Sequence, residues 1–287
     1  EILTQAGWRR IDEIKVGEMA LTRIDDSGSL EWNKVEAVPQ VFAPKLYYFK
    51  NQSINMQGTP EHKMVIKRRR RNKQGIFRVE ASKLWKMSEC LVPLTGVNNK
   101  IAPASLFGYD AEDIAEFLGW YISEGNSKIK NGKKTTIIIA QDKKANPEKC
   151  ERLEDLFDRL GFSWRYYGNA YGVGVKGMSE TLRAEIYKQP KSDGKFIPKL
   201  FFEQPRNVIE KLLAGLILGD GCITRSEGRK DAVNYFTKSA QLAGDVQALA
   251  VLVNKRATVR QRKTGLYVVH FGYKQWASVD DAKHAIV

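Results

Sequence analysis

The chain is poor in cysteine and has no long apolar run. Its 287 residues include three cysteines, Cys90, Cys150 and Cys222, and no two of them have Cys-x-x-Cys spacing. We therefore expect reduced thiols in a cytosolic protein rather than a zinc site or a disulfide framework. No apolar run is long enough to span a membrane, and no signal peptide opens the sequence. We expect no membrane partner, and a protein of the cytoplasm or nucleoid that is not secreted.

Acidic residues are also few. The chain has 33 Asp and Glu against 47 Lys and Arg, which gives a net charge of +14. A positive field of this size favours a polyanionic partner, although a basic protein without a nucleic-acid partner stays open on charge alone. Hydrophobic residues make up 43% of the chain, enough for ordinary cores, and the length predicts two or three domains.

Two strings of the sequence share one pattern. Phe117–Gly125 reads FLGWYISEG and Leu213–Gly221 reads LAGLILGDG. Each is apolar and ends in an acid followed by a glycine, and the two acids, Glu124 and Asp220, lie 96 positions apart. The same offset relates Leu153 to Leu249, Leu156 to Leu252 and Tyr171 to Tyr267. A register that persists in this way indicates an internal duplication.

Each string predicts a helix with small residues on one face. They lie four positions apart and are Gly119 and Ser123 in the first string and Gly215 and Gly219 in the second. Small residues let two helix backbones approach closely, so we expect the helices to pair along this face. Gly125 and Gly221 then act as helix stops, of the type that often takes left-handed backbone.

Pairing of the helices would bring Glu124 and Asp220 together at the helix ends. Two carboxylates at helix C-termini repel each other and the helix dipoles. The arrangement is reasonable if a divalent cation or a proton lies between them. Hard oxygen ligands suit Mg²⁺, and Mg²⁺ suits phosphodiester hydrolysis.

These residues resemble the LAGLIDADG homing endonucleases. The second string matches the family name at LAGLI and closes with the acid–glycine pair, and the first resembles it at the glycine, the small residue and the acid–glycine pair. A single string of this kind is also typical of an ordinary buried helix. The resemblance covers about residues 110–287. It implies a site-specific endonuclease that uses Mg²⁺ or Mn²⁺, cuts double-stranded DNA and leaves short 3′ overhangs.

The resemblance also implies roles for individual residues. Glu124 and Asp220 would bind the metal and position the attacking water. Family members often add a basic residue beside the site, and Lys238 is the candidate here, with a solvent-facing strand end as the alternative.

The offset of 96 pairs Lys238 with Asp142 and Thr237 with Gln141. Gln141 therefore joins the candidate catalytic residues, and the pocket is predicted to be asymmetric. An asymmetric monomer does not require a palindromic DNA target. We therefore expect a monomer that recognises a long, non-palindromic target.

The fold implied is α+β. Two αββαββ halves, residues 110–187 and 207–287, would be related by a pseudo-twofold axis and form a DNA-binding saddle. One face of each sheet would pack on helices and the other would be open. Residues 188–206 join the halves, and their prolines and glycine argue against a regular element.

Within the first half we expect the motif helix, a strand pair around Lys128–Ala140, a helix at 147–160 and a strand pair at 162–176. The second half should repeat this order and end in a helix from Lys274 to about Ala285.

Basic residues on the predicted ribbons are candidates for DNA contact. Arg260, Arg262 and Lys263 lie on or near one ribbon, and Arg165 lies on its counterpart. Arg260 and Arg262 would share a face at period two, so they could read guanines in the major groove. Phosphate contact is an equally open role for each of them.

Residues 1–95 are β-rich, and residues 96–109 resemble a linker. The ILT…GW…VG pattern near the start and the Thr59-x-x-His62 box resemble the Hint module of inteins, in which the two box side chains polarise the scissile peptide. A β-turn with a nearby surface histidine is the alternative. The basic run Lys67–Arg71 is either a solvated loop or a further DNA-phosphate contact.

The sequence departs from the intein pattern at its first and last residues. An intein starts with a nucleophile and ends in Asn, whereas this sequence starts at Glu1 and ends at Val287. We therefore expect no splicing from the chain as given, which is either a fragment of a larger intein or a vestigial module. Two other functions stay open: a protein-splicing element, and a decayed, maturase-like module that binds DNA or RNA. Intact Glu124 and Asp220 argue against decay.

Overall fold

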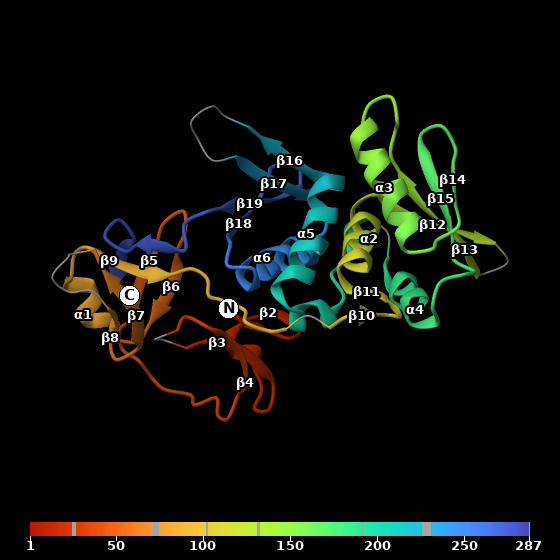
Figure 1. Ribbon diagram of the computed structural model, residues 1–287. Helices are drawn as coiled ribbons and strands as arrows, with labels where there is room; N and C mark the ends of the chain where they lie inside the picture. The colour runs from red at the N-terminus through yellow and green to blue at the C-terminus, as the bar shows by residue number, and fades with distance from the viewer. Residues whose placement is uncertain are drawn as a thin grey trace. The chain divides into compact units, whose positions relative to one another are not determined.

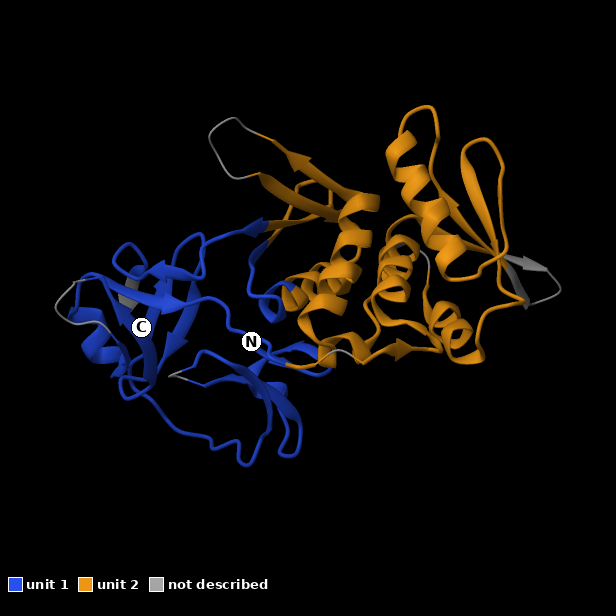
Figure 2. Ribbon diagram, viewed as in Figure 1, with its two compact units in different colours: residues 1–99, 250–258, 271–287 blue, residues 100–249, 259–270 orange. Residues whose placement is uncertain are grey.

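The chain forms two compact units (Figure 2). The computed structural model describes residues 1–24, 27–69, 75–101, 103–130, 133–190, 192–225 and 231–286. Unit 1 comprises residues 1–99, 250–258 and 271–287, and unit 2 comprises residues 100–249 and 259–270. Both ends of the chain therefore belong to unit 1. No helix among the described residues is long and apolar enough to cross a membrane.

Unit 1 consists mainly of short strands (Figure 1). Its strands are β1 Ile2–Thr4, β2 Gly7–Arg9, β3 Met19–Arg23, β4 Leu30–Lys34, β5 Tyr47–Lys50, β6 Asn55–Gly58, β7 Lys63–Arg68, β8 Ile76–Glu80, β9 Cys90–Pro93, β20 Trp276–Ser278 and β21 Lys283–Ile286. Its helices are the 3₁₀ turn η1 Ile11–Glu13 and α1 Ala81–Lys86. The strands form three sheets, with orders β2-β1-β3-β4, β20-β9-β7-β8 and β21-β5-β6.

The first strands follow from local sequence. Thr4 Oγ donates to the Gly7 carbonyl oxygen at 2.9 Å, and Gly7 takes φ +97°, a left-handed backbone that favours glycine. Ala6-Gly7 thus lies at the turn that joins β1 to β2.

The C-terminal segment differs from the sequence prediction. We expected a helix over Lys274–Ala285, but the segment holds β20 and β21, which pair with β9 and β5. Ala277, Val279 and Ala282 are buried in the core of unit 1 beside Phe49 and Val92. The alternation of buried and exposed residues suits a strand, and pairing with distant strands overrides the order expected from the duplication.

Unit 2 carries most of the helices. In chain order its elements are β10 Ser105–Leu106, β11 Tyr109–Asp110, α2 Ala111–Glu124, β12 Gly125–Lys130, β13 Lys133–Ala140, α3 Pro147–Arg159, β14 Trp164–Tyr166, β15 Ala170–Gly174, α4 Glu180–Lys188, η2 Ser192–Gly194, η3 Lys199–Glu203, α5 Arg206–Asp220, β16 Gly221–Thr224, β17 Ala232–Thr237, α6 Ala240–Leu252, β18 Arg256–Gln261 and β19 Tyr267–Gly272. The end of α6 and parts of β18 and β19 are counted in unit 1.

Helices α2 and α5 contain the two repeated strings and are called the motif helices below. The four-stranded sheets that follow them have matching strand orders, β12-β13-β15-β14 and β16-β17-β19-β18.

Five short elements of unit 2 were not predicted: α4, the strands β10 and β11, and the 3₁₀ helices η2 and η3, which lie in the segment 188–206 where we expected no regular element. Helix α4 is capped by Ser179, whose hydroxyl accepts from the Leu182 amide, and it buries Leu182 and Ile186. The hairpin β10–β11 begins within the segment 96–109 that we treated as a linker.

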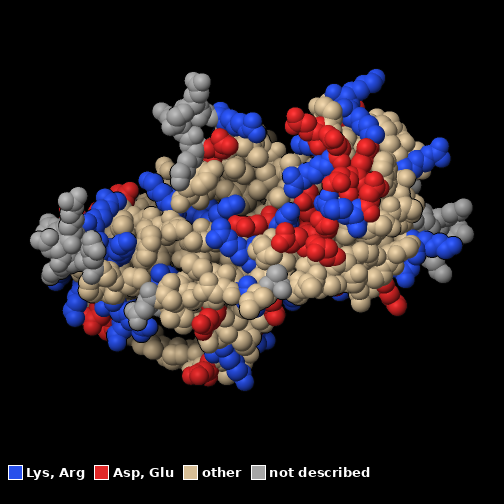
Figure 3. Space-filling view, viewed as in Figure 1, with Lys and Arg blue, Asp and Glu red and all other residues tan. Residues whose placement is uncertain are grey.

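Helix α3 covers one face of the first sheet. Arg152 on α3 donates to the buried carboxylate of Glu116 on α2 at 2.5 and 2.9 Å. Tyr171 and Val173 on β15 point to the buried side. The outer surface of α3 is acidic, as Figure 3 shows, because it carries Glu148, Glu151, Asp155 and Asp158. This helix-covered side is therefore a poor surface for a polyanion.

Candidate active site

The motif helices α2 and α5 pack through their glycines. A Cβ added at Gly119 would lie 2.3 Å from the Leu212 carbonyl oxygen, and one added at Gly215 would lie 2.3 Å from the Glu116 carbonyl oxygen. Since any side chain would collide with backbone, only glycine allows this approach. Ser123 Oγ donates to the Leu216 carbonyl oxygen at 3.0 Å across the same contact.

The helix ends are also close. A Cβ at Gly219 would lie 2.5 Å from Ser123 Cβ and 3.1 Å from Glu124 Cγ. The structure thus places all four predicted small residues at the contact between the helices, with Glu124 and Asp220 as the last residues of α2 and α5.

The two glycines that follow the acids do not take the left-handed backbone that we expected of them. Gly125 has φ −82° and Gly221 has φ −101°, so neither takes left-handed backbone. A Cβ at Gly125 would lie 2.2 Å from the Tyr121 carbonyl oxygen, and one at Gly221 would lie 2.3 Å from the Ile217 carbonyl oxygen. These glycines are required because each strand leaves its helix in close contact with the last turn.

Burial raises the pKa of both acids above the ordinary carboxyl value. The charge of Asp220 raises the pKa of Glu124 further, whereas Lys149 and Lys195 lower the pKa of both carboxyls. The nearby lysines therefore favour the anionic form of these two half-buried carboxyls, which burial disfavours.

Lys195 is one of these cations, and the sequence analysis did not select it. It lies between η2 and η3, and its Nζ donates to the carbonyl oxygens of Ser123 at 2.9 Å and Gly125 at 3.2 Å. Burial lowers the pKa of Lys195, while the charges of Asp220 and Glu124 oppose that shift. The available signal was the apolar sequence that follows Lys195, including Phe196 and Ile197, which indicates a buried segment.

Two contacts hold the Lys195 segment in place. Ser239 Oγ donates to the Lys195 carbonyl oxygen at 2.6 Å, and the Ile197 amide donates to Asp245 at 2.9 Å. Ser239 lies just before α6, and Asp245 lies in the middle of that helix. A lysine from the connecting segment is thereby fixed beside acids carried by two helices.

Lys149 is the second cation missed by the sequence analysis. It lies on α3, and its Nζ donates to the Leu218 carbonyl oxygen at 2.6 Å. The predicted basic residue, Lys238, follows β17 and is exposed. The cations that act on the two acids are Lys195 and Lys149, so a role for Lys238 stays a prediction.

Gln141 lies directly after β13 and is buried. Its Nε2 is 3.5 Å from Glu124 Oε1, and its Oε1 is buried without a hydrogen-bond partner among the described residues. The corresponding Thr237 is also buried, and its hydroxyl accepts from the Ser239 amide. The two sides of the site therefore differ chemically.

The residues at this site fit a divalent cation of the Mg²⁺ type. Glu124 and Asp220 supply hard anionic oxygens, and Gln141, whose Nε2 faces Glu124, has a buried side-chain oxygen that lacks a partner. Within the described ranges no group of three or more His, Cys, Asp or Glu side chains could hold a metal. Water or substrate oxygens would therefore complete the coordination of such a cation.

The predicted DNA-contact residues lie on the sheet faces away from the helices or at hairpin ends. Arg165 is exposed on β14 and lies over the Tyr167 ring at 5.8 Å. Arg260 is exposed on β18, and Arg262 lies over the Phe236 ring at 5.3 Å. Lys263 is exposed in the β18–β19 turn.

Thr59 and His62 lie in unit 1, in the turn after β6. The His62 amide donates to the Thr59 carbonyl oxygen at 3.0 Å, and the imidazole is exposed. Lys67–Arg69 of the basic run are described, and Arg70 and Arg71 lie outside the described residues.

Comparison with known proteins identifies one domain. Residues 207–277 match the LAGLIDADG-like domain family. The chain is 25% identical over 246 residues to a DNA polymerase of Thermococcus kodakarensis, covering 84% of this chain and 14% of the polymerase. It is 23% identical over 286 residues to a replication factor C small subunit of Methanocaldococcus jannaschii, covering 88% of this chain and 15% of that protein. The chain thus spans about a seventh of the length of these curated relatives.

Solved structures similar to this chain include homing endonucleases. One is I-DmoI in complex with DNA and Mn, with 15% identity, a TM-score of 0.39, and coverage of 56% of this chain and 90% of that one. Another is I-WcaI bound to its DNA recognition sequence, with 13% identity, a TM-score of 0.38, and coverage of 57% and 76%.

Proposed function

We propose that this chain, which contains a LAGLIDADG-like domain, is a site-specific double-strand DNA endonuclease of the homing type. The observation that carries the proposal is the pair of half-buried carboxylates, Glu124 and Asp220, at the ends of two glycine-packed helices. Two nearby lysines, Lys195 and Lys149, offset their charge. Two carboxylates and a buried lysine suit hydrolysis of a phosphodiester.

In this mechanism Glu124 and Asp220 hold the cation, which would be Mg²⁺ or Mn²⁺. When bound, it would polarise the phosphate and lower the pKa of water. Gln141 would add its free carbonyl oxygen to the same side of the site. Lys195 would place positive charge beside the phosphate and the leaving 3′-oxygen, and its lowered pKa makes its proton easier to transfer. Cutting both strands would leave short 3′ overhangs.

We further propose that the two halves of unit 2 are related by a pseudo-twofold axis and form a saddle. The matching strand orders after α2 and α5 support this arrangement. Arg165, Arg260, Arg262 and Lys263 would contact DNA on the open faces, opposite the acidic side of α3. Because one chain carries both acids and its two sides differ at Gln141 and Thr237, we propose a monomer with a long, non-palindromic target.

The test is cleavage of a library of long randomised DNA duplexes in Mg²⁺, with sequencing of the cut ends. Glu124→Gln and Asp220→Asn should each abolish cutting while DNA binding is nearly retained. Glu151→Gln removes an exposed carboxylate of α3 and serves as the matched control. Cutting by either active-site variant at the parental rate contradicts the proposal.

A second proposal concerns the origin of the chain. Unit 1, a Hint-like module, would belong to an intein in which unit 2 is inserted. Unit 1 is assembled from both ends of the chain, and Thr59 and His62 follow β6 in it. The relatives include two differently named proteins, each matched over a small part of its length, as expected for an element inserted into different hosts.

The coding sequence tests this origin. An open frame that continues on both sides into the two parts of one host protein supports an intein, and such a full-length product should yield a ligated host. A frame that encodes no host sequence on either side contradicts it. A nuclease acting on chromosomal DNA in this way would work in the cytoplasm or nucleoid.

A further inference from the structure

Unit 1 contains a basic cavity that the proposed nuclease site does not use. The cavity has a volume of about 640 Å³ and is lined by Arg69, Arg256, Lys274 and Trp276, together with the polar residues Gln52 and Ser53. A cavity of this size is large enough for a nucleotide unit rather than for a single ion alone.

Positive charge dominates the lining. In the part of the chain that the structure describes, no ion pair occupies Arg69, Arg256 or Lys274. The lining carboxylate, Asp281, accepts a hydrogen bond from Asn51 Nδ2 at 3.1 Å. The three cations are therefore available to an anion from outside.

Arg256 gives the strongest indication of a missing partner. Its Nε is buried and has no hydrogen-bond partner among the described residues. The guanidinium lies along the backbone of Gly272, where an added Cβ would be 3.5 Å from Nε. A buried guanidinium N–H without an acceptor is costly, and a phosphate oxygen is the acceptor it matches best.

Trp276 adds an aromatic surface to the same lining. Its ring is half-buried, and Lys67 Nζ lies 5.8 Å from the ring centroid. Lys67 begins the basic run that the nuclease site leaves unexplained. Cations beside an aromatic ring are typical of surfaces that follow a nucleic-acid backbone.

We propose that this cavity binds phosphodiester groups of double-stranded DNA through Arg69, Arg256 and Lys274. This inference rests on the proposed DNA-cleaving function, to which it adds a second DNA contact located in unit 1. Free inorganic phosphate carries the same kind of anionic oxygens as a DNA phosphodiester. The experiment must therefore distinguish binding of DNA from binding of free phosphate.

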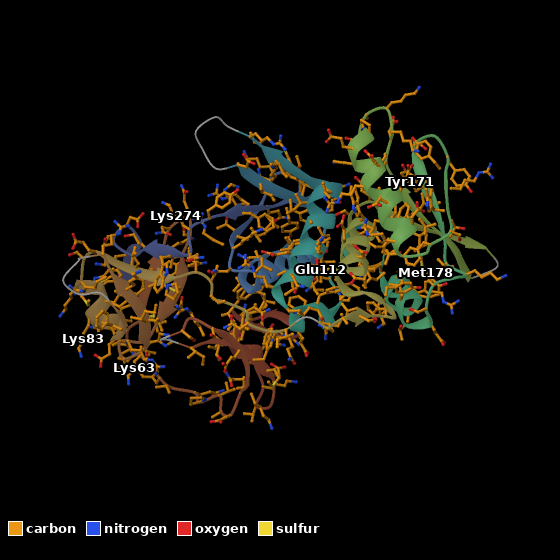
Figure 4. All side chains as sticks on the ribbon, in the orientation of Figure 1. Lys63, Lys83, Glu112, Tyr171, Met178 and Lys274 are labelled. Carbon is orange, nitrogen blue, oxygen red and sulfur yellow. The ribbon has the colours of Figure 1, made fainter. Side chains whose placement is uncertain are left out.

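The experiment measures the affinity of the full chain for a duplex of unrelated sequence over a series of salt concentrations. Arg69→Ala with Lys274→Ala removes two exposed cations of the cavity. Lys63→Ala with Lys83→Ala removes two exposed lysines of the same unit and is matched in charge. Figure 4 shows Lys63 and Lys83 on the side of unit 1 opposite Lys274.

The cavity variant should reduce the slope of log K against log salt by about two, since each lost phosphate contact removes about 0.9. The control variant should leave the slope nearly unchanged. Arg256→Gln should also reduce the slope, by about one.

Equal slopes for the cavity and control variants overturn the inference. That result would not affect the proposed nuclease, because its test is cutting. Calorimetric titration with inorganic phosphate gives the other arm. If the cavity variant loses phosphate binding while its DNA slope matches that of the control, the site takes free phosphate and the inference is wrong.

Discussion

At the scale of single residues, two opposing effects act on the pKa of Lys195. Burial lowers its pKa, while the charges of Asp220 and Glu124 raise it. In turn, Lys195 lowers the pKa of both carboxyls, which burial raises. The lysine and the acids thus help one another to stay ionised in a half-buried site.

Lys195→Met should reduce cutting by roughly 10²–10³-fold, the effect of removing one group that stabilises transition-state charge. The acid limb of the pH–rate profile of any residual activity should move to higher pH, because the pKa values of Glu124 and Asp220 rise when the cation is lost. Lys199→Met, an exposed neighbour, is the control. A variant with full activity, or with an unmoved acid limb, would show that Lys195 has no part in the site.

Asp245 predicts a pH dependence of stability. Burial raises the pKa of Asp245 to about 6, although it accepts from the Ile197 amide and from Gln241. A folded-state pKa above the unfolded value favours the folded state at low pH, and this contribution is lost as pH rises through the folded value.

Relative to Asp245→Asn, the parent protein should therefore lose about 1 kcal/mol of stability between about pH 5 and about pH 7.5. Urea denaturation of both proteins at the two pH values measures this difference. A constant difference between parent and variant would mean that Asp245 does not titrate as the structure indicates.

At the scale of elements, the α2–α5 contact sets the geometry of the site. The carbonyl oxygens of Glu116 and Leu212 lie only 2.3 Å from the positions that Cβ atoms would take at Gly215 and Gly119. The acids at the helix ends can be adjacent only because the backbones touch along this line.

Gly215→Leu should lower the stability of unit 2 by about 1–3 kcal/mol or more, because a large side chain overpacks a contact that has no room for a methyl group. The change is measured as a drop in Tm. Gly177→Ala is the control, since an added Cβ there meets nothing within 4 Å. Equal Tm values for Gly215→Leu and the control would argue against tight packing of the motif helices.

At the scale of the whole molecule, charge is unevenly distributed. The net charge is +14, yet the outer surface of α3 is acidic (Figure 3). The basic side chains that we propose to contact DNA lie elsewhere, on β14, on β18 and its following turn, and around the cavity of unit 1.

Binding of duplex DNA should depend steeply on salt. A long site with on the order of ten phosphate contacts gives a slope of log K against log salt near −9, at about 0.9 per contact. Affinity should fall by several decades from low to moderate salt. Fluorescence anisotropy with a labelled duplex measures the slope, and a nearly flat dependence would contradict nucleic-acid binding altogether.

The sequence by itself determined the features that local chemistry dictates. Small residues four apart and an acid before glycine define the motif helices, and the offset of 96 relates the two copies. The turn at Gly7 and the strand pair at Lys128–Ala140 likewise follow from short-range pattern.

Only the tertiary structure decided which groups surround the acids. Lys195 comes from a connecting segment and Lys149 from α3, and neither has a spacing that relates it to Glu124 or Asp220. The segment after Lys274 became strands because β5 and β9, far away in sequence, offered free edges and a core for Ala277 and Val279. Local pattern records which residues share a face, whereas long-range pairing and burial decide which faces meet.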